Sequence, residues 1–489
     1  MKIVTILLFG TAFLASAVFA QPAATSDSLK IGDINVSGSL RTRGELWDWF
    51  NGGANNDYAF SESILRVSFS ESRNSFDWQL ELAAPLLLGL PDDAIAPAPQ
   101  GQLGFGASYF ASNDSNRNAG MVFAKQGFFR FKKLGGVDGQ TLTFGRMQFI
   151  DGAEVAPKDS TLATLKRDRI AQRLIGDFGF SDVGRSFDGA QFVRNFGSRM
   201  NLTLFGGRPT RGVLQVDGWG EVNINVYYTA LTGEVGGQRN SGEWGVFGLG
   251  YQDLRDGVLK TDNRPASIRT ADTDHINIGT FGGHYIHTID TRAGRFDALG
   301  WLALQTGSWG RLDHRADAFA AEGGWQPHIL PGLKPWLRGG VDYGSGDKNP
   351  NDSTHGTFFQ VLPTPRIYAR FPFFNMMNNR DAFGELVLRP AKLVTIRSDI
   401  HSLSLANRND LWYSGGGAYQ PWTFGYVGRP SNGNTSLATL YDVSGDFNVN
   451  SHFSLGTYYA RAQGKSVMES IYTQGKNANF WYVELMVKF

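Results

Sequence analysis

The sequence predicts an all-β protein: a transmembrane antiparallel β-barrel of about 18 strands, with short periplasmic turns and long extracellular loops. Three observations support this fold class. Polar and apolar side chains alternate along many segments, the connections between these segments alternate between short and long, and the composition includes 61 glycines and 13% aromatic residues. Mean hydropathy is −0.24, and no apolar run after the N-terminal segment approaches the ~18 residues of a spanning helix.

Residues 1–20 are predicted to be a secretory signal peptide rather than part of the fold. Lys2 gives a positive start, residues 3–14 form a short apolar run, and Val18 and Ala20 are small residues before a cleavage site after Ala20. A buried N-terminal strand is the alternative. Residues 21–28 are predicted to be a flexible lead-in, and residues 29–489 a single barrel domain.

The first strands show the alternation most clearly. In the first predicted strand, roughly Lys30 to Trp47, polar residues at 39, 41, 43 and 45 alternate with residues 40, 42, 44 and 46. The next strands, at residues 65–70 and 76–82, show the same period of two. A soluble sheet that packs on a core would show this alternation as well. The lengths of the connections separate the two cases.

Short and longer connections alternate along the whole chain. The short ones are predicted at 72–74, 135–139, 195–198, 236–243, 290–294, 327–334, 390–392 and 450–451. The longer ones are predicted at 85–120, 150–186, 207–221, 254–274, 306–314, 344–380, 404–436 and 464–479. Outer-membrane barrels follow this rule, and the count is about 18 strands with both termini on the periplasmic side. Residues 172–178 are assigned to their loop, because another strand would spoil the alternation.

The final stretch, Phe480 to Phe489, is predicted to close the barrel. Trp481, Val483 and Leu485 lie on one face and Glu484 on the other. The stretch resembles the C-terminal strand of bacterial outer-membrane barrels, which the assembly machinery reads and which pairs with the first strand. A buried C-terminal strand of a soluble sandwich is the alternative.

Composition and motifs argue against other classes of protein. The chain has no cysteine, so no disulfide framework holds it, and its net charge of +1 gives no field that points to nucleic acid. His284 and His287 look like a metal pair, but a spacing of three places them on opposite faces of a strand. We find no nucleophile elbow, phosphate loop or HExxH motif. We therefore expect no enzyme activity, no cofactor and no metal site.

Several stretches resemble the bacterial alginate-export family of outer-membrane barrels. They are residues 40–47, 142–148, 173–178, 343–347 with 356–358, 410–413 and 454–458. The resemblance implies an 18-stranded barrel whose constriction, rich in arginine and lysine, passes the anionic polysaccharide alginate. It places Arg66, Lys125 and Arg146 among lumen-facing cations, with looser matches at Arg366, Arg370 and Arg397. Gln126 stands where the family has an acidic residue, and the long loops do not match.

Cations in the middle of strands are predicted to face the lumen, because a cation on the lipid face costs about 2–4 kcal/mol near the midplane. They are Arg41, Arg43, Arg66, Arg130, Lys132, Arg338 and Arg397. One interpretation is a path for anions, which arginine binds through its fork of donors. The other is a structural network with the acids Asp77, Glu81, Asp342, Asp399 and Glu484.

Two further groups have two interpretations each. The loop cations form a basic constriction if the loop folds inward, and a solvated or lipopolysaccharide-facing patch, the commoner arrangement, if it stays outside; they are Lys166, Arg167, Arg169 and Arg173. The aromatic residues that flank the strands are predicted to form interfacial girdles, with a sugar-stacking platform as the alternative. They are Trp47, Trp49, Phe50, Tyr58, Phe60, Phe371, Phe373, Phe374, Trp481 and Tyr482.

The expected function is that of a monomeric channel in the bacterial outer membrane, through which anionic solutes or an alginate-like polysaccharide pass by diffusion. Expected partners are lipid and lipopolysaccharide, the barrel-assembly machinery through Phe489, an anionic polysaccharide and a periplasmic export partner. The alternatives are a substrate-specific porin for small solutes and a plugged receptor or adhesin barrel. A soluble β-protein ranks third.

Overall fold

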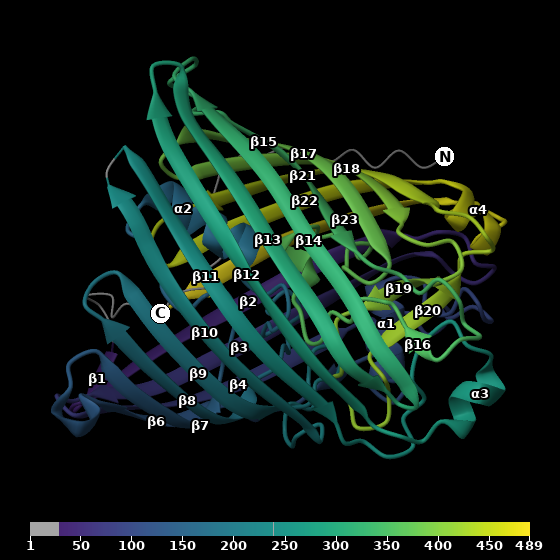
Figure 1. Cartoon of the computed structure of the whole chain (residues 1–489), viewed down its shortest axis with the longest axis horizontal. Helices are drawn as coiled ribbons and strands as arrows, with labels where there is room; N and C mark the ends of the chain where they lie inside the picture. The colour runs from purple at the N-terminus through teal and green to yellow at the C-terminus, as the bar shows by residue number, and fades with distance from the viewer. Residues whose placement is uncertain (1–28, 238) are drawn as a thin grey trace.

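The computed structural model describes residues 29–237 and 239–489, and the predicted signal peptide and lead-in lie outside the described residues. The chain forms a closed antiparallel barrel of 18 long strands (Figure 1). In chain order the barrel strands are β2 (Ile34–Asp48), β3 (Asp57–Ser72), β4 (Phe76–Leu88), β6 (Phe123–Lys132), β7 (Gln140–Met147), β8 (Phe187–Phe196), β9 (Met200–Pro209), β10 (Ile224–Gly237), β11 (Asn240–Asp253), β12 (Ile276–Thr291), β13 (Gly294–Trp309), β14 (Leu312–Pro327), β15 (Trp336–Gly344), β17 (Asn379–Ala391), β18 (Val394–Leu405), β21 (Ser436–Asn448), β22 (Phe453–Gly464) and β23 (Asn477–Lys488). The first and last of them pair, from Ser39 with Lys488 to Asp48 with Asn479, so the sheet has no free edge there.

The remaining elements are short. The additional strands are β1 (Leu29–Ile31), β5 (Ala119–Gly120), β16 (Thr354–His355), β19 (Leu411–Gly415) and β20 (Tyr426–Pro430). The helices are α1 (Phe105–Ser112), η1 (Leu134–Gly136), α2 (Ser160–Leu165), η2 (Lys166–Ile170), α3 (Ala266–Ala271), η3 (Pro365–Ile367) and α4 (Ser466–Ile471). Among residues 29–237 and 239–489, no helix is both long and apolar enough to cross a membrane.

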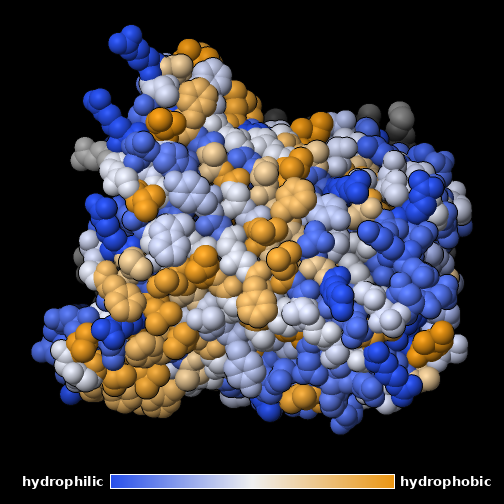
Figure 2. All heavy atoms as spheres, in the orientation of Figure 1, coloured by the Kyte–Doolittle hydropathy of each residue, from blue (hydrophilic) through white to orange (hydrophobic). Residues whose placement is uncertain are grey.

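Side chains alternate between lumen and lipid along the strands, as the sequence predicts. On β23, Trp481 and Val483 expose 51% and 53% of their surface, whereas the alternate residues Phe480 and Tyr482 are buried. Figure 2 shows the result: apolar residues gather over the strands, and hydrophilic residues cover the side where the long loops lie. This outward apolar surface is what a barrel presents to lipid.

The connections follow the predicted alternation with two differences. The predicted first strand is interrupted at Gly32, whose φ of 63° makes a turn, so that β1 folds back on β2. The predicted medium connection at 306–314 is a tight turn, because β13 runs to Trp309 and β14 starts at Leu312. Residues 172–178 form no strand, as predicted; their one described bridge joins Ile175 to Leu362.

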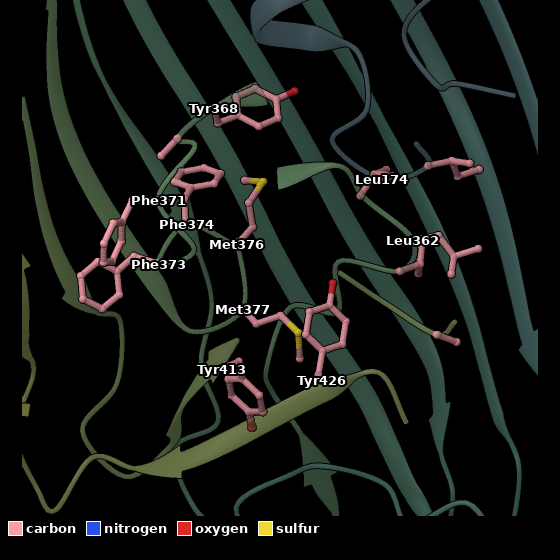
Figure 3. Packing of buried hydrophobic residues seen from close by; sticks show 14 of the residues in the cluster. Leu174, Leu362, Tyr368, Phe371, Phe373, Phe374, Met376, Met377, Tyr413 and Tyr426 are labelled. Carbon is pink, nitrogen blue, oxygen red and sulfur yellow. The ribbon is translucent and has the colours of Figure 1, made fainter. Parts of the chain in front are cut away.

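Three long connections fold into the barrel instead of staying outside. They are residues 148–186 between β7 and β8, 345–378 between β15 and β17, and 406–435 between β18 and β21. Their apolar residues join the inward side chains of the strands in one buried cluster. Figure 3 shows Tyr368, Phe371, Phe373, Phe374, Met376 and Met377 packed together in front of the barrel strands. The first of these connections, residues 148–186, is named the plug loop below.

Candidate functional site in the barrel lumen

Most of the cations singled out in the strands lie on inward faces. On β2, Arg41 and Arg43 share the face of the buried Trp47, since side chains two residues apart point the same way. By the same alternation, five further cations point inward. They are Arg66 on β3, Arg130 and Lys132 on β6, Arg338 on β15 and Arg397 on β18. These side chains line the lumen.

Arg146 is the exception, and its predicted place in the lumen is wrong. It lies two residues from Phe144, which is exposed on the outer face and stacks on Phe129 of the neighbouring strand. Its neighbour Met147 is the buried, inward residue. Arg146 therefore lies on the outer face at the loop end of β7, where its guanidinium binds Asp188 of β8 with an Nη2–Oδ2 distance of 2.7 Å.

The plug loop runs through the lumen from one end to the other. It leaves β7 at the outer end, and Asp159, which caps α2, pairs with Arg295, the second residue of β13 after a periplasmic turn. Helix α2 packs against β11 and β12. The loop cations thus point inward, and the expectation of a solvated outer patch is wrong for Lys166, Arg169 and Arg173.

The loop cations meet carboxylates on the barrel wall. Lys166 Nζ lies 2.5 Å from Glu243 Oε1 on β11. Arg169 binds Glu322 of β14 at 2.9 Å, and Arg173 binds Asp342 of β15 at 2.6 Å. Because these charges are neutralised in place, this part of the loop occupies the lumen without making it basic.

Arg338 belongs to the same group of ion pairs. Its guanidinium lies 3.0 Å from Glu322 and 3.2 Å from Asp297, and its side chain is almost fully buried. We call this group the sealed cluster; it consists of Arg169, Arg173, Arg338, Asp297, Glu322 and Asp342. Asp297 and Glu322 are not among the predicted lumen residues, although both are acidic residues in strands with alternating polarity.

Two of the predicted lumen cations hold loops through backbone carbonyls. Lys125 Nζ donates to the carbonyl oxygens of Val183 and Arg185 at 2.7 and 3.2 Å, and it is buried. Arg366, in the connection 345–378, donates to the carbonyl oxygens of Phe371 and Phe374. Among the described residues neither has a carboxylate within ion-pair distance, and both are structural donors.

Arg41 and Arg43 attach the end of the plug loop to the first strand. Arg41 Nη2 lies 2.5 Å from Asp182 Oδ1 and donates to the carbonyl of Ser181. Arg43 binds Glu484 of β23 at 2.6 Å. These contacts join the plug loop to the seam where the barrel closes.

A buried carboxylate holds the start of the plug loop. Asp151 Oδ1 accepts hydrogen bonds from the backbone N–H groups of Leu174 and Ile175, at 3.1 and 2.7 Å. Burial raises the pKa of Asp151 to about 7, because the low-dielectric surroundings disfavour its charged form. The fold of this loop is therefore coupled to pH near neutrality.

The aromatic residues predicted as girdles are mostly inside the barrel. Trp47 stacks on Phe480 with ring centroids 4.0 Å apart, and Trp49 stacks on Phe371 at 5.4 Å. The other inward members are Phe50, Tyr58, Phe60, Phe373, Phe374 and Tyr482. Trp481 alone of the ten is strongly exposed on the lipid side. The girdle prediction is wrong for the others, because loops folded into the lumen give inward aromatics an apolar partner.

A second group of inward cations keeps contact with water. We call it the basic vestibule; it consists of Arg66, Arg130, Lys132, Arg370 and Arg397. The strand members lie in the periplasmic halves of their strands, and Arg370 reaches the same depth by pairing with Asp446 of β21 at 3.6 Å. The wall that carries them runs from β18 through the closing seam to β6.

In the vestibule each arginine is more exposed than its acidic partner. Arg66 exposes 25% of its side chain against 10% for Glu81, and Arg130 exposes 27% against 18% for Asp77. The N–O distances, 3.8 and 4.0 Å, are long for ion pairs. The guanidinium groups thus retain donors that face the lumen.

The chain matches one protein family and is similar in fold to several solved outer-membrane proteins. The family described as "Alginate export" matches residues 171–463, more than half of the chain. No curated protein sequence matches the chain. Structures similar in fold include Pseudomonas aeruginosa OccK9 (OpdG), with a TM-score of 0.59, 10% identity and coverage of 94% of this chain and 98% of that one. The P. aeruginosa outer membrane protein OpdK has a TM-score of 0.54 at 9% identity, covering 93% and 98%.

Acinetobacter baumannii OccAB2 is similar to the same degree, with a TM-score of 0.55, 9% identity, and 93% and 98% coverage. At such low identity these likenesses show the fold alone, and the family match adds the class of protein. The matched family is one of channels rather than enzymes. With its closed barrel and inward loops, the chain belongs to the alginate export family and is a channel of the bacterial outer membrane.

Proposed function

We propose that this channel passes anionic solutes or an acidic, alginate-like polysaccharide along the basic vestibule. The observation that carries the proposal is the exposure of the vestibule arginines beyond their carboxylate partners. Arg397, for example, exposes 27% of its side chain while Glu385, 3.3 Å away, exposes 7%. An anion in the lumen meets the guanidinium groups before it meets the acids.

Arginine suits this role for physical reasons. Its planar fork donates two parallel hydrogen bonds to a carboxylate, and it stays charged at any physiological pH. Cations that line a narrow space with low-dielectric walls raise the local concentration of anions. Loose pairing keeps the guanidinium available, since an ion in transit competes with a carboxylate that is 3.3 to 4.0 Å away.

The proposal is tested by the reversal potential of the refolded protein in a planar bilayer under a salt gradient. Wild type is expected to be anion-selective, and the double variant Arg66→Glu, Arg397→Glu is expected to lose or invert this selectivity. Arg315→Glu is the matched control, because Arg315 has an outward side chain that is 77% exposed. Cation selectivity of the wild type, or equal behaviour of the two variants, would refute the proposal.

A substrate-specific porin for small solutes is the second candidate, and the plug loop favours it. The loop crosses the lumen and binds both β14 and β15, which narrows the passage. OpdF, a P. aeruginosa protein with a TM-score of 0.53 and 9% identity, has been solved in complex with glucuronate. Current block by single uronates and by uronate oligomers separates the candidates: block by both supports polymer passage, and block by the monomer alone supports a small-solute porin.

A further proposal concerns Phe489 and the barrel-assembly machinery. Phe489 and Gly38 exchange backbone hydrogen bonds of 2.7 and 3.0 Å, and the ring of Phe489 covers Gly38, where a Cβ would lie 2.4 Å from it. The ring is 57% exposed at the periplasmic end. We propose that it offers the assembly machinery an apolar contact; Phe489→Ser should reduce the fraction of folded barrel in cells, measured in membrane extracts.

A further inference from the structure

A histidine and three aspartates gather on the inner wall, next to the vestibule residue Arg397. Asp399 and His401 are two residues apart on β18 and share its inward face. Asp442 lies directly opposite Asp399 on β21, and Asp381 projects from β17 on the other side. Three neighbouring strands thus bring four titratable side chains together on one face.

Asp381 orients the imidazole. Its Oδ2 lies 2.7 Å from Nδ1 of His401, and this contact places a proton on Nδ1. Nε2 lies on the other side of the ring. Both residues are 2% exposed, so the orientation is fixed by the packing around them.

The other ring nitrogen lacks a partner. Among the described residues, Nε2 of His401 and Oδ1 of Asp399 are buried and make no hydrogen bond. Ligand atoms of Asp399, His401 and Asp442 all lie within 4.8 Å of one another. Buried polar atoms without a partner are unfavourable, because they have lost their hydrogen bonds to water, and a bound cation would satisfy them together.

His284 shows what a satisfied buried histidine looks like in this barrel. Its Nε2 lies 2.7 Å from Glu243 Oε2, and the other oxygen of Glu243 binds Lys166. That group is a closed ion-pair network. His401 differs because Asp381 binds Nδ1 and Nε2 has no partner among the described residues.

We propose that Asp399, His401 and Asp442 bind a divalent transition-metal ion of the Zn²⁺ type, and that Asp381 is a positioning residue. Zn²⁺ takes imidazole nitrogen and carboxylate oxygen at about 2.0–2.2 Å, which sets ligand atoms ~3.4 Å apart in a tetrahedron. The three ligand atoms lie within 4.8 Å of one another, so the distance between any two has to shorten by at most about 1.4 Å to reach that spacing. A carboxylate hydrogen-bonded to the second nitrogen of a ligating histidine is the usual arrangement at such sites.

The site is connected to a loop in the lumen. Tyr458 donates its hydroxyl hydrogen to Asp442 Oδ2 at 2.9 Å and accepts a hydrogen bond from the backbone N–H of Phe371 at 3.1 Å. Phe371 belongs to the connection 345–378. A bound cation would thus neutralise two wall carboxylates close to Arg397 and fix the side chain that holds this loop.

The test uses the refolded full chain in detergent, stripped with EDTA and titrated with ZnCl₂ in a calorimeter. A single equivalent is expected to bind, with at least a tenfold loss of affinity in His401→Gln and in Asp399→Asn. Asp381→Asn should bind about 10–100-fold more weakly, because it leaves the ligands in place but frees the ring. His284→Gln is the matched control and should bind as wild type.

Two further measurements keep the result decisive. Circular dichroism and gel mobility show whether each variant is a folded barrel, and Zn X-ray absorption on the wild type should show one imidazole among nitrogen and oxygen ligands. Absence of Zn²⁺ binding by the wild type would overturn the proposal, and so would undiminished binding by folded His401→Gln. The cluster would then be carboxylates that share a proton. None of these readouts depends on ion selectivity.

Discussion

Two parts of the lumen place arginine beside carboxylate with different geometry. In the sealed cluster, Arg173 is fully buried and lies 2.6 Å from Asp342. In the basic vestibule, Arg130 exposes 27% of its side chain and lies 4.0 Å from Asp77. The two regions use the same chemical groups, so the difference in role comes from burial and distance.

The physical reason is the cost of desolvation. A buried charge needs its partner, because several kcal/mol of hydration are lost when it leaves water. A partly exposed pair keeps most of its hydration and contributes about 0–1 kcal/mol to stability. Sealed pairs therefore hold the plug loop, and loosely paired cations are free to meet ions in transit.

The largest effect is expected from breaking the sealed cluster. Arg173→Ala leaves Asp342 and Glu322 partly uncompensated and should lower the free energy of unfolding by about 3–5 kcal/mol. It should also raise the single-channel conductance, because the plug loop loses an anchor. Denaturant unfolding in detergent measures the free energy of unfolding, and recordings in planar bilayers measure the conductance. Arg167→Ala is the control: its side chain is 34% exposed beside Asp168, and its effect should stay within about 0.5 kcal/mol.

A somewhat smaller effect is expected in the apolar part of the packed lumen. Phe371→Ala removes a ring that stacks on Trp49 and should cost about 3 kcal/mol through the cavity it leaves. Phe144→Ala is the control, since Phe144 faces lipid. The midpoint of thermal unfolding compares them, and an equal or greater loss for Phe144→Ala would contradict the inward assignment of the aromatic cluster.

A pH-dependent effect of intermediate size is expected at Asp151. Its pKa is raised to about 7 in the packed loop, against the ordinary 3.8. The packed loop therefore binds the proton more tightly than the released loop, so packing is favoured at low pH and weakens as pH rises from about 4 through about 7. Channel open probability should increase over this range. In Asp151→Asn the open probability should change less with pH. An unchanged pH dependence in that variant would assign the response to other groups.

The smallest change in stability is expected in the vestibule. Arg66→Gln removes a charge whose partner Glu81 lies 3.8 Å away, and the free energy of unfolding should change by less than about 0.5 kcal/mol. The anion preference should still fall, by less than in the double charge reversal. A large loss of stability without any change in selectivity would place Arg66 with the sealed cluster.

The strands could be predicted from the sequence because the alternation of side chains and the turn residues that mark them lie within short segments. The period of two in β23 predicts which side chains meet lipid, and turn residues such as those around Asn450 show where strands end. The length of β13 was underestimated because Thr306 and Gly307 look like turn residues, although pairing with β12 extends the strand to Trp309.

The candidate site was less predictable, because its geometry depends on contacts between distant segments. Nothing periodic in residues 148–186 shows that Arg169 and Arg173 meet Glu322 and Asp342. Arg146 was misplaced because a motif match gives a position in the chain but not the face of the strand. Inward and lipid-facing aromatics such as Trp47 and Trp481 likewise have the same local pattern.

The route of the plug loop has a consequence for the order of assembly. Arg169 and Glu322 are 153 residues apart in the chain, and Arg173 and Asp342 are 169 residues apart. The loop emerges between β7 and β8, yet its anchors lie on β14 and β15, which are synthesised later. The loop can make these contacts only when β14 and β15 are in place, so its seating depends on contacts between segments far apart in the chain, which form slowly.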